Sequence, residues 1–367
     1  MFGLQRQTEP ASSHQHQQVL SQDLSQYEDE VVLRFNWTEP EHGQIFKSAA
    51  ERLVLDLWNL YEPEMADVRI HKQRIRDLLK LLPKQMRDKR RWDFNIPDVQ
   101  WAVVNSLPIS SRHEQEFFDD YRPLRDIYAW MSKMEKKHEL LKVENLGLTS
   151  EGNELKALRV GSGKTKVVVA GGVQAREWLT VSSTLYAVNC LLNEDPQLLR
   201  KHVTVYFVPI VNPDGYEYTW TTDRLWKKNR QATGVALCSG IDINQSLNFD
   251  DGEDISQCSE NYGGRTPHEA LEARHMAHLM NRTSSKTLIN FESYSQRIVM
   301  PKNYKKDLTK QIRQTTGRDY QMSASDGTSW AVKLPDIERN GFLAHKKYIK
   351  EMGEEAHKIL QVILSSL

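Results

Sequence analysis

Residues 171–178, GGVQAREW, bring polar side chains to the end of an apolar run. That run, residues 166–172, has the continuous apolar composition of a strand buried on both faces. Gln174 and Glu177 follow it three residues apart, and a His in place of the Gln would complete half of a zinc site that activates water for hydrolysis. The amide oxygen of Gln is instead a poor partner for zinc. The motif raises the question of whether the chain keeps the framework of a zinc enzyme without its metal.

Two other patterns look like ligand sites but are better explained as structure. Residues 160–165, VGSGKT, resemble a phosphate-binding loop, but Leu158 stands where the motif needs Gly, and a strand pattern follows instead of a helix. We predict a hairpin turn there. His275 and His278 lie one helical turn apart, but no third metal ligand is near in sequence, which favours a solvated helix face.

The composition is that of a globular protein large enough for two domains. The chain has 367 residues, of which 39% are apolar and 27% charged. Its 49 Lys and Arg residues balance 49 Asp and Glu residues, so no net field attracts nucleic acid or an anionic membrane. No apolar run approaches the roughly 18 residues of a membrane span. We therefore predict neither a nucleic-acid partner nor a membrane span, and any ligand must be inferred from a site.

Four segments differ in pattern along the chain. Residues 1–25 are rich in Gln, His and Ser and are predicted to be a disordered arm. Residues 26–110 are predicted to form a small α+β domain, followed by a polar linker over residues 111–120 and a larger domain over residues 121–367. In the small domain, strands are expected in residues 30–35, 52–58 and 66–71, and a helix in residues 72–83.

The larger domain alternates strand patterns with helix patterns. Strands are predicted over residues 166–172, 203–211, 286–295 and 330–336, and helices over residues 178–192, 268–282 and 346–367. The first two strands are continuously apolar, and the last helix has its apolar residues on one face. We therefore predict an α/β fold in which helices cover a mixed sheet.

Five blocks of the sequence occur in the order found in one protein family. They are QAREW (174–178), NPDGYEYTW (212–220), DRLWKKNR (223–230), CSGID (238–242) and SYSQ (293–296). In this order they resemble the A/B-type zinc metallocarboxypeptidases, which are secreted with an N-terminal pro-domain. The resemblance implies a mixed eight-stranded sheet flanked by helices, the zinc carboxypeptidase fold, with the small α+β domain as the pro-domain.

The resemblance places the zinc-ligand positions of active members at Gln174, Glu177 and Glu292. Only Glu177 matches the family. A Gln and two Glu residues form an all-oxygen set, which suits calcium or magnesium better than zinc. Zn²⁺ is the cofactor of the family, but the altered set predicts that this chain binds none.

Two lysines replace catalytic residues of the active members. Lys333 aligns with the general base, and a protonated Lys cannot accept a proton from water. Beside Glu177 and Glu292, its ammonium is expected to take the place of the metal charge and to form an internal ion pair. Lys227 aligns with the Arg that stabilises the oxyanion, so a point charge remains without the guanidinium fork.

The positions that bind the terminal carboxylate of a peptide substrate also differ. Asn244 and Gln245 replace an Asn-Arg pair, which removes the cation that would bind that carboxylate. Arg176 is retained and is expected to present a cation to the cleft. Peptide or protein C-termini are the partners that the resemblance implies.

These changes lead to the interpretation of an inactive homologue, a pseudoenzyme of this family. An active zinc carboxypeptidase that removes C-terminal residues is the alternative. The changes at the base and carboxylate positions resemble the fungal inactive metallocarboxypeptidase-like proteins implicated in cell-wall organisation. That subgroup implies a secreted or vacuolar protein, although the first residues have no apolar signal core.

Features outside the site agree with a secretory compartment. Asn36 and Asn281 each begin a glycosylation sequon. Cys238 and Cys258 lie in one loop-rich segment, and the resemblance implies that they form a disulfide. A bridge closing a loop of this length is expected to stabilise the fold by about 3 kcal/mol.

Overall fold

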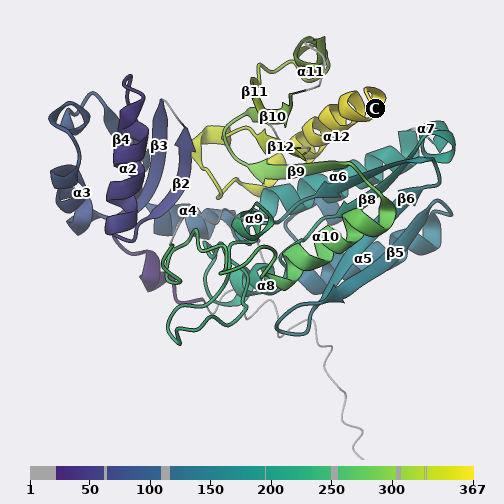
Figure 1. The fold of residues 1–367 in the computed structure, drawn as a ribbon, viewed down its shortest axis with the longest axis horizontal. Coiled ribbons are helices and arrows are strands. Elements are labelled where there is room, and N and C mark those ends of the chain that lie inside the picture. Colours follow the sequence, from purple (N-terminus) through teal and green to yellow (C-terminus); the bar gives the residue numbers. More distant parts are fainter. Residues whose placement is uncertain are drawn as a thin grey trace, which may run out of the picture.

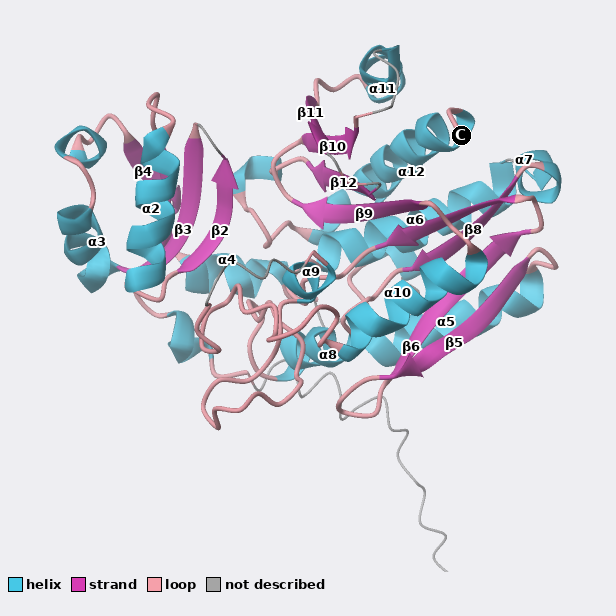
Figure 2. Cartoon of the chain, viewed as in Figure 1, coloured by secondary structure: helices cyan, strands magenta, loops and turns pink. Residues whose placement is uncertain are grey.

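The computed structural model describes residues 22–367 apart from 62–63, 109–115, 195, 249–254, 303–306, 326 and 328. It contains a four-stranded sheet near the N-terminus and an eight-stranded sheet in the rest of the chain (Figures 1 and 2). This confirms the predicted α/β fold class with a small α+β domain at its N-terminal side. The domain boundaries stay predictions, and most of the predicted arm and linker lies outside the described residues.

The N-terminal sheet is antiparallel, in the order β2-β3-β1-β4. The strand expected over residues 52–58 begins only at Asp56, because Arg52 ends helix α2 and residues 53–55 form the connection to the strand. Helix α2 buries Phe46 and Ala49 against the sheet. The sequence patterns missed α2, β4 and α4. The elements are β1 (Glu30–Asn36), α2 (Glu41–Arg52), β2 (Asp56–Tyr61), β3 (Met65–His71), α3 (Ile75–Leu81), β4 (Trp92–Ile96) and α4 (Val99–Ser106).

The second sheet is mixed, in the order β11-β10-β12-β9-β7-β8-β6-β5. Its four central strands, β12, β9, β7 and β8, are parallel, and β6 and β5 add antiparallel strands at one side. The strands are β5 (Leu141–Leu148), β6 (Glu154–Gly161), β7 (Thr165–Ala170), β8 (Val203–Val208), β9 (Thr287–Ser293), β10 (Arg297–Pro301), β11 (Gln321–Ser325) and β12 (Ser329–Leu334).

Helices cover both faces of this sheet (Figure 2). Successive residues of β7 alternate between the two cores, because side chains alternate along a strand: Val167 and Val169 join one core, and Val168 and Ala170 the other. The first core includes α5 (Leu124–Lys137), α6 (Trp178–Glu194) and α12 (Ile349–Ser365), and the second includes α10 (Leu271–Thr283). The remaining helices are α7 (Pro196–Lys201), α8 (Pro213–Thr221), α9 (Ile243–Leu247) and α11 (Asp307–Thr316).

The glycine-rich turn after β6 is not the hairpin that its sequence suggested. A strand follows it, as expected, and no phosphate-binding helix begins there. However, β6 and β7 do not pair with each other, because β8 lies between them in the sheet. The turn therefore connects two strands that are one strand apart.

The two sheets meet through a shared apolar cluster. Tyr27 and Trp58 from the N-terminal part are buried in the same cluster as Leu225, Tyr294 and Phe342 from the second part. The rings of Trp58 and Phe342 have their centroids 5.0 Å apart. The N-terminal domain therefore packs directly on the segments that follow β9 and β12. Within the described part of the chain, no helix is long and apolar enough to cross a membrane.

The described chain begins with an ordered segment. Gln22 is buried, and its Nε2 donates to the backbone carbonyl of Thr219 at 2.9 Å. Leu24–Tyr27 then forms a 3-10 helix. The hydroxyl of Tyr27 donates to Asp223 at 2.7 Å. Gln22 and Tyr27 thus attach the start of the described chain to the second domain, and the predicted disorder does not extend to residues 22–25.

Candidate functional site

The predicted metal position lies at one edge of the parallel part of the sheet. Gln174 and Glu177 lie in the loop between β7 and α6, Glu292 lies near the end of β9, and Lys333 lies near the end of β12. These three strands are parallel, so their carboxyl ends share the edge where α/β proteins commonly bind ligands. Glu292 and Lys333 are direct register partners. The topology therefore brings residues from distant parts of the chain to one site.

Glu177 is the most buried of these side chains. It is 1% exposed, and neither of its carboxyl oxygens has a well-formed hydrogen bond among the described residues. Burial raises the pKa of Glu177 well above its usual range, and the charge of Glu292 adds to this. The Ser293 amide, Lys333 and Arg176 lower the pKa by less. The site therefore favours the protonated, neutral form of Glu177, which is a weak metal ligand.

Glu292 is already bonded within the protein. Its Oε2 lies 3.4 Å from the Nζ of Lys333, and its Oε1 accepts a hydrogen bond from the Nδ2 of Asn290 at 2.8 Å. The side chains of Glu292 and Lys333 are 14% and 32% exposed. No ion pair joins Lys333 to Glu177 in the described part of the chain. The ammonium thus balances the charge of Glu292, and it lowers the pKa of Glu177 by less than burial raises it.

The residues at this position do not fit zinc. Gln174 provides an amide oxygen, Glu177 favours its neutral form, and Glu292 contacts a cation. Structural and catalytic zinc sites use Cys, His and ionised carboxylates. The residues that the structure describes contain no group of three His, Cys, Asp or Glu side chains able to hold a metal ion. An ammonium beside the site would also repel a divalent cation.

Lys227, at the predicted oxyanion position, is also neutralised internally. Its Nζ lies 2.8 Å from Oδ2 of Asp242 and donates to Oδ1 of Asn261 at 2.7 Å. The side chains of Lys227 and Asp242 are 7% and 3% exposed. A cation held in a buried pair has little capacity to bind a charge that develops elsewhere. Lys227 therefore acts as a structural link between the loop after α8 and the start of α9.

Arg176 does not present a cation to an open cleft, which corrects the sequence-based expectation. Its Nη1 donates to both carboxylate oxygens of Asp56, at 2.7 and 2.9 Å, and the side chain is 1% exposed. Asp56 belongs to β2 of the N-terminal domain. The guanidinium also lies 4.2 Å from the ring centroid of Phe342 and 5.7 Å from that of Trp58. The carboxylate of Asp56 therefore already binds the cation that a substrate carboxylate would need.

Asn244 and Gln245 are neighbours on α9, but their side chains have different surroundings. The Nδ2 of Asn290 lies 3.4 Å from Oδ1 of Asn244, which connects Asn244 to the Glu292 site through one side chain. Gln245 is exposed to solvent. Asp242 begins the helix by accepting a hydrogen bond from the backbone of Asn244. Asn244 therefore lies at the site and Gln245 at its rim.

The sequence patterns missed the residues that neutralise the site. Asp56, Asn290 and Asn261 lie outside the family blocks, and a single carboxyl or amide residue gives no spacing signal. Asp242 lies in the block CSGID and combines two roles, as the cap of α9 and as the partner of Lys227. Only the capping role has a recognisable sequence signal, an Asp directly before a helix.

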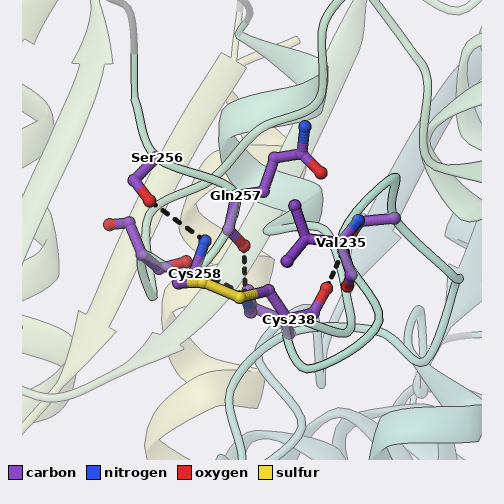
Figure 3. The surroundings of a disulfide bond; sticks show 8 residues. Val235, Cys238, Ser256, Gln257 and Cys258 are labelled. Carbon is purple, nitrogen blue, oxygen red and sulfur yellow. Dashed lines mark hydrogen bonds between the residues drawn. A yellow bond between two sulfur atoms is a disulfide. The ribbon is translucent and has the colours of Figure 1, made fainter.

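The structure contains the disulfide that the resemblance implied, and the asparagines of both sequons are exposed. Cys238 and Cys258 form a disulfide with 4.7 Å between their Cα atoms (Figure 3). The backbone amide of Cys258 donates to Oγ of Ser256, and that of Cys238 to the carbonyl of Val235. Asn36 and Asn281 are both exposed. Glycosylation at these two positions stays a prediction.

Comparison with solved structures agrees with this architecture. The carboxypeptidase A of Helicoverpa armigera superposes with a TM-score of 0.78 and 20% identity, over 92% of this chain and 97% of its own. Thrombin-activatable fibrinolysis inhibitor superposes with a TM-score of 0.74 and 22% identity, over 92% of this chain and 98% of its own. At these identities the match shows the fold alone.

Comparison with protein sequences identifies the family. The zinc carboxypeptidase family model, Peptidase_M14, matches residues 127–321. The inactive metallocarboxypeptidase ECM14 of Saccharomyces cerevisiae is 32% identical over 94% of this chain and 92% of its own length. The inactive metallocarboxypeptidase ecm14 of Sclerotinia sclerotiorum is 29% identical over 92% of this chain and 73% of its own. A chain with these motifs, this sheet and these relatives belongs to the M14 zinc carboxypeptidase family.

Proposed function

We propose that this chain is a catalytically inactive member of its family, which acts by binding or scaffolding and not by hydrolysis. The observation that carries this proposal is the ion pair between Lys333 and Glu292 at the position of the zinc ligands. It puts a cation of the protein where an active enzyme needs both a metal and a base. The names of the two relatives, each called inactive, support the same conclusion.

The side chains that each chemical step of peptide hydrolysis needs are replaced at this site. Metal-bound water is acidified only by a bound metal with an open position, and this donor set does not fit zinc. Lys333 is paired with Glu292 and does not act as a general base. Lys227 is paired with Asp242, so no free cation stabilises the oxyanion at that position.

Binding of a peptide C-terminus conflicts with the two-domain structure. Arg176 is the retained cation of the cleft, and Asp56 binds it with both carboxylate oxygens. A substrate carboxylate would have to displace a buried, bidentate intramolecular partner. We therefore propose that the two domains together form the scaffold, and that C-terminal peptides bind only when the Asp56 contact is removed.

Zinc content and peptidase activity test this proposal together. We expect well below one zinc per chain by elemental mass spectrometry, and no release of C-terminal residues from blocked dipeptides with added zinc. One zinc per chain together with hydrolysis would refute the proposal. The control is the triple variant Gln174→His, Glu292→His, Lys333→Glu, which restores the ligand set and the base. Zinc near one per chain in this variant would show that these positions account for the loss.

The structure also bears on where the protein resides and in which process it takes part. The disulfide between Cys238 and Cys258 and the exposed Asn36 and Asn281 support a secreted or vacuolar protein. The resemblance stated above supports a role in cell-wall organisation. Expression of the protein in a fungal host, followed by glycosidase treatment, tests the location. An electrophoretic mobility that glycosidase leaves unchanged would argue against passage through the secretory route.

A further inference from the structure

Positive charge is distributed unevenly over this chain. Residues 72–91 contain nine Lys and Arg residues and two Asp residues, a net charge of +7, although the whole chain has 49 basic and 49 acidic residues. All nine basic side chains in this segment are exposed. We call this segment, with its exposed cations, the basic patch. The remainder of the chain therefore has a net negative charge, and the basic patch is a local positive field.

The basic patch lies far from the site described above. It comprises the 3-10 helix Lys72–Arg74, α3, the 3-10 helix Lys84–Arg87 and the turn that leads into β4. Figure 1 shows α3 at the outer edge of the N-terminal domain, on the side away from the eight-stranded sheet. Leu78, Leu82 and Met86 are each at most 1% exposed and anchor the segment in the N-terminal core. The apolar side chains therefore face inward and the cations face solvent.

Most of these cations are not neutralised by the protein. Six of them form no ion pair with any residue that the structure describes, unlike the buried cations of the cleft: Arg74, Arg76, Lys84, Arg87, Lys89 and Arg91. Two of the six are oriented by backbone carbonyls, which hold a guanidinium without cancelling its charge. Arg74 donates to the carbonyl of Leu53 at 2.6 Å, and Arg87 donates to that of Leu82 at 2.8 Å.

The composition of the basic patch selects among classes of anionic partner. Arginine binds sulfate and phosphate groups through its planar fork of donors, and five of the nine basic residues are Arg. Proteins that bind a membrane surface usually place exposed apolar side chains among the cations. None of the large exposed apolar side chains found in the described chain falls within residues 72–91. A disulfide such as Cys238–Cys258 is typical of proteins from oxidising compartments, where nucleic acid is not a usual partner.

A groove beside the basic patch offers contacts for a neutral part of such a ligand. It has a volume of about 350 Å³ and lies between α2 and α3. Gln44, Ser48 and Arg52 provide polar groups, and Ile45 and Leu81 provide an apolar wall. Amide, hydroxyl and guanidinium groups next to an apolar wall are suited to sugar hydroxyls and the C–H face of a sugar ring. We propose that the basic patch is a docking surface for an anionic polysaccharide that carries sulfate or phosphate groups.

Binding of the full chain to immobilised polysaccharides tests this proposal. The probes are heparin for sulfate, phosphorylated dextran for phosphate and unmodified dextran as the uncharged control. We expect binding to at least one charged polymer and none to unmodified dextran. We also expect the affinity for the charged polymer to fall at least tenfold between about 50 and 300 mM salt, because salt weakens contacts to a polyanion over this range. The charged polymer that binds with the higher affinity identifies whether sulfate or phosphate is recognised.

Charge-reversal variants separate the basic patch from net charge. The variant Arg76→Glu, Lys84→Glu, Arg91→Glu reverses three exposed, unpaired cations of the basic patch. The matched control reverses three exposed lysines of the second domain and changes the net charge equally: Lys133→Glu, Lys142→Glu, Lys164→Glu. We expect at least a tenfold loss of affinity in the first variant and less than a twofold change in the control, with both variants folded by circular dichroism.

Three results would overturn the proposal. The first is an equal loss of affinity in both variants, which would mean that net charge alone governs binding. The second is no binding of the parent chain to either charged polymer at 50 mM salt. The third is tighter binding to vesicles of anionic phospholipid or to duplex DNA than to both polysaccharides.

Discussion

The pair between Asp56 and Arg176 makes a sharp test of how the two domains are joined. Asp56 belongs to the N-terminal domain and Arg176 to the loop before α6, and their side chains are 8% and 1% exposed. Asp56 also accepts a hydrogen bond from Nε1 of Trp58 at 2.9 Å and lies 3.3 Å from Nε of Arg69. Asp56→Asn keeps the shape of the side chain but removes its charge. The variant therefore leaves the guanidinium of Arg176 buried without the carboxylate to which it is hydrogen-bonded.

The expected cost is large because both groups are buried. Breaking a buried ion pair by removing one partner typically costs about 3–5 kcal/mol, since the remaining charge stays desolvated. The amide that the substitution introduces still accepts one hydrogen bond, so we expect a value near the lower end, about 3 kcal/mol. We also expect the N-terminal domain to be released more readily, which increases cleavage of the chain by a protease added at low concentration.

The assay is urea unfolding followed by tryptophan fluorescence, together with limited proteolysis. The control is Asp93→Asn, because Asp93 pairs with Arg339 across the same domain boundary but the two side chains are 55% and 48% exposed. Exposed pairs contribute about 0–1 kcal/mol, so the control is expected to unfold almost like the parent chain. Equal, small effects of both substitutions would refute the reasoning that Asp56 holds the domains together.

The same pair predicts a direction of pH dependence. Burial by itself would raise the pKa of Asp56, but Arg176, Arg69 and its hydrogen bonds lower the pKa below its usual value. A carboxyl whose pKa is lower in the folded state contributes stability above its unfolded pKa of about 4 and loses it as the pH falls further. The parent chain is therefore expected to lose stability in acid through this group, and Asp56→Asn to lack that part of the loss.

Three further substitutions test other parts of the structure. Lys333→Glu places a third carboxyl beside Glu292 and is expected to lower stability by about 1–2 kcal/mol without producing activity, measured by urea unfolding and a peptidase assay; unchanged stability would contradict the ion pair. Burial raises the pKa of Glu272 to about 7, so its contribution to stability is full below about pH 4 and is lost as the pH rises through 7. Glu272→Gln is expected to flatten this decline, and melting curves at pH 5 and pH 8 that stay parallel to those of the parent chain would exclude it. Replacing Cys238 and Cys258 by Ser is expected to cost about 3 kcal/mol, with the parent chain under reducing conditions as the comparison.

Much of the fold was predictable from local patterns. The continuous apolar runs predicted β7 and β8, because a strand buried on both faces needs apolar residues at every position. Helical spacing predicted α6, α10 and α12. In the small domain, α2 was missed because its few apolar residues are interrupted by charged and polar ones, and β4 because it spans only five residues. Strand order was also beyond reach, as the turn after β6 showed.

The sequence by itself was enough to predict that the catalytic machinery has changed. Each changed group, Gln174, Glu292, Lys227 and Lys333, is visible as a residue type within or beside a recognisable motif. Residue type alone decides whether a side chain can ligate zinc or accept a proton, so no structure was needed for that inference.

Only the tertiary structure decided how the altered charges are balanced. Asp56 and Arg176 are 120 residues apart, and Lys227 finds Asp242 and Asn261 in different loops. Coulomb energy depends on distance and on desolvation, and both are set by packing between segments that sequence separation does not reveal. The sequence therefore predicted a free cation at Arg176, whereas the packing of the N-terminal domain supplies its counter-ion.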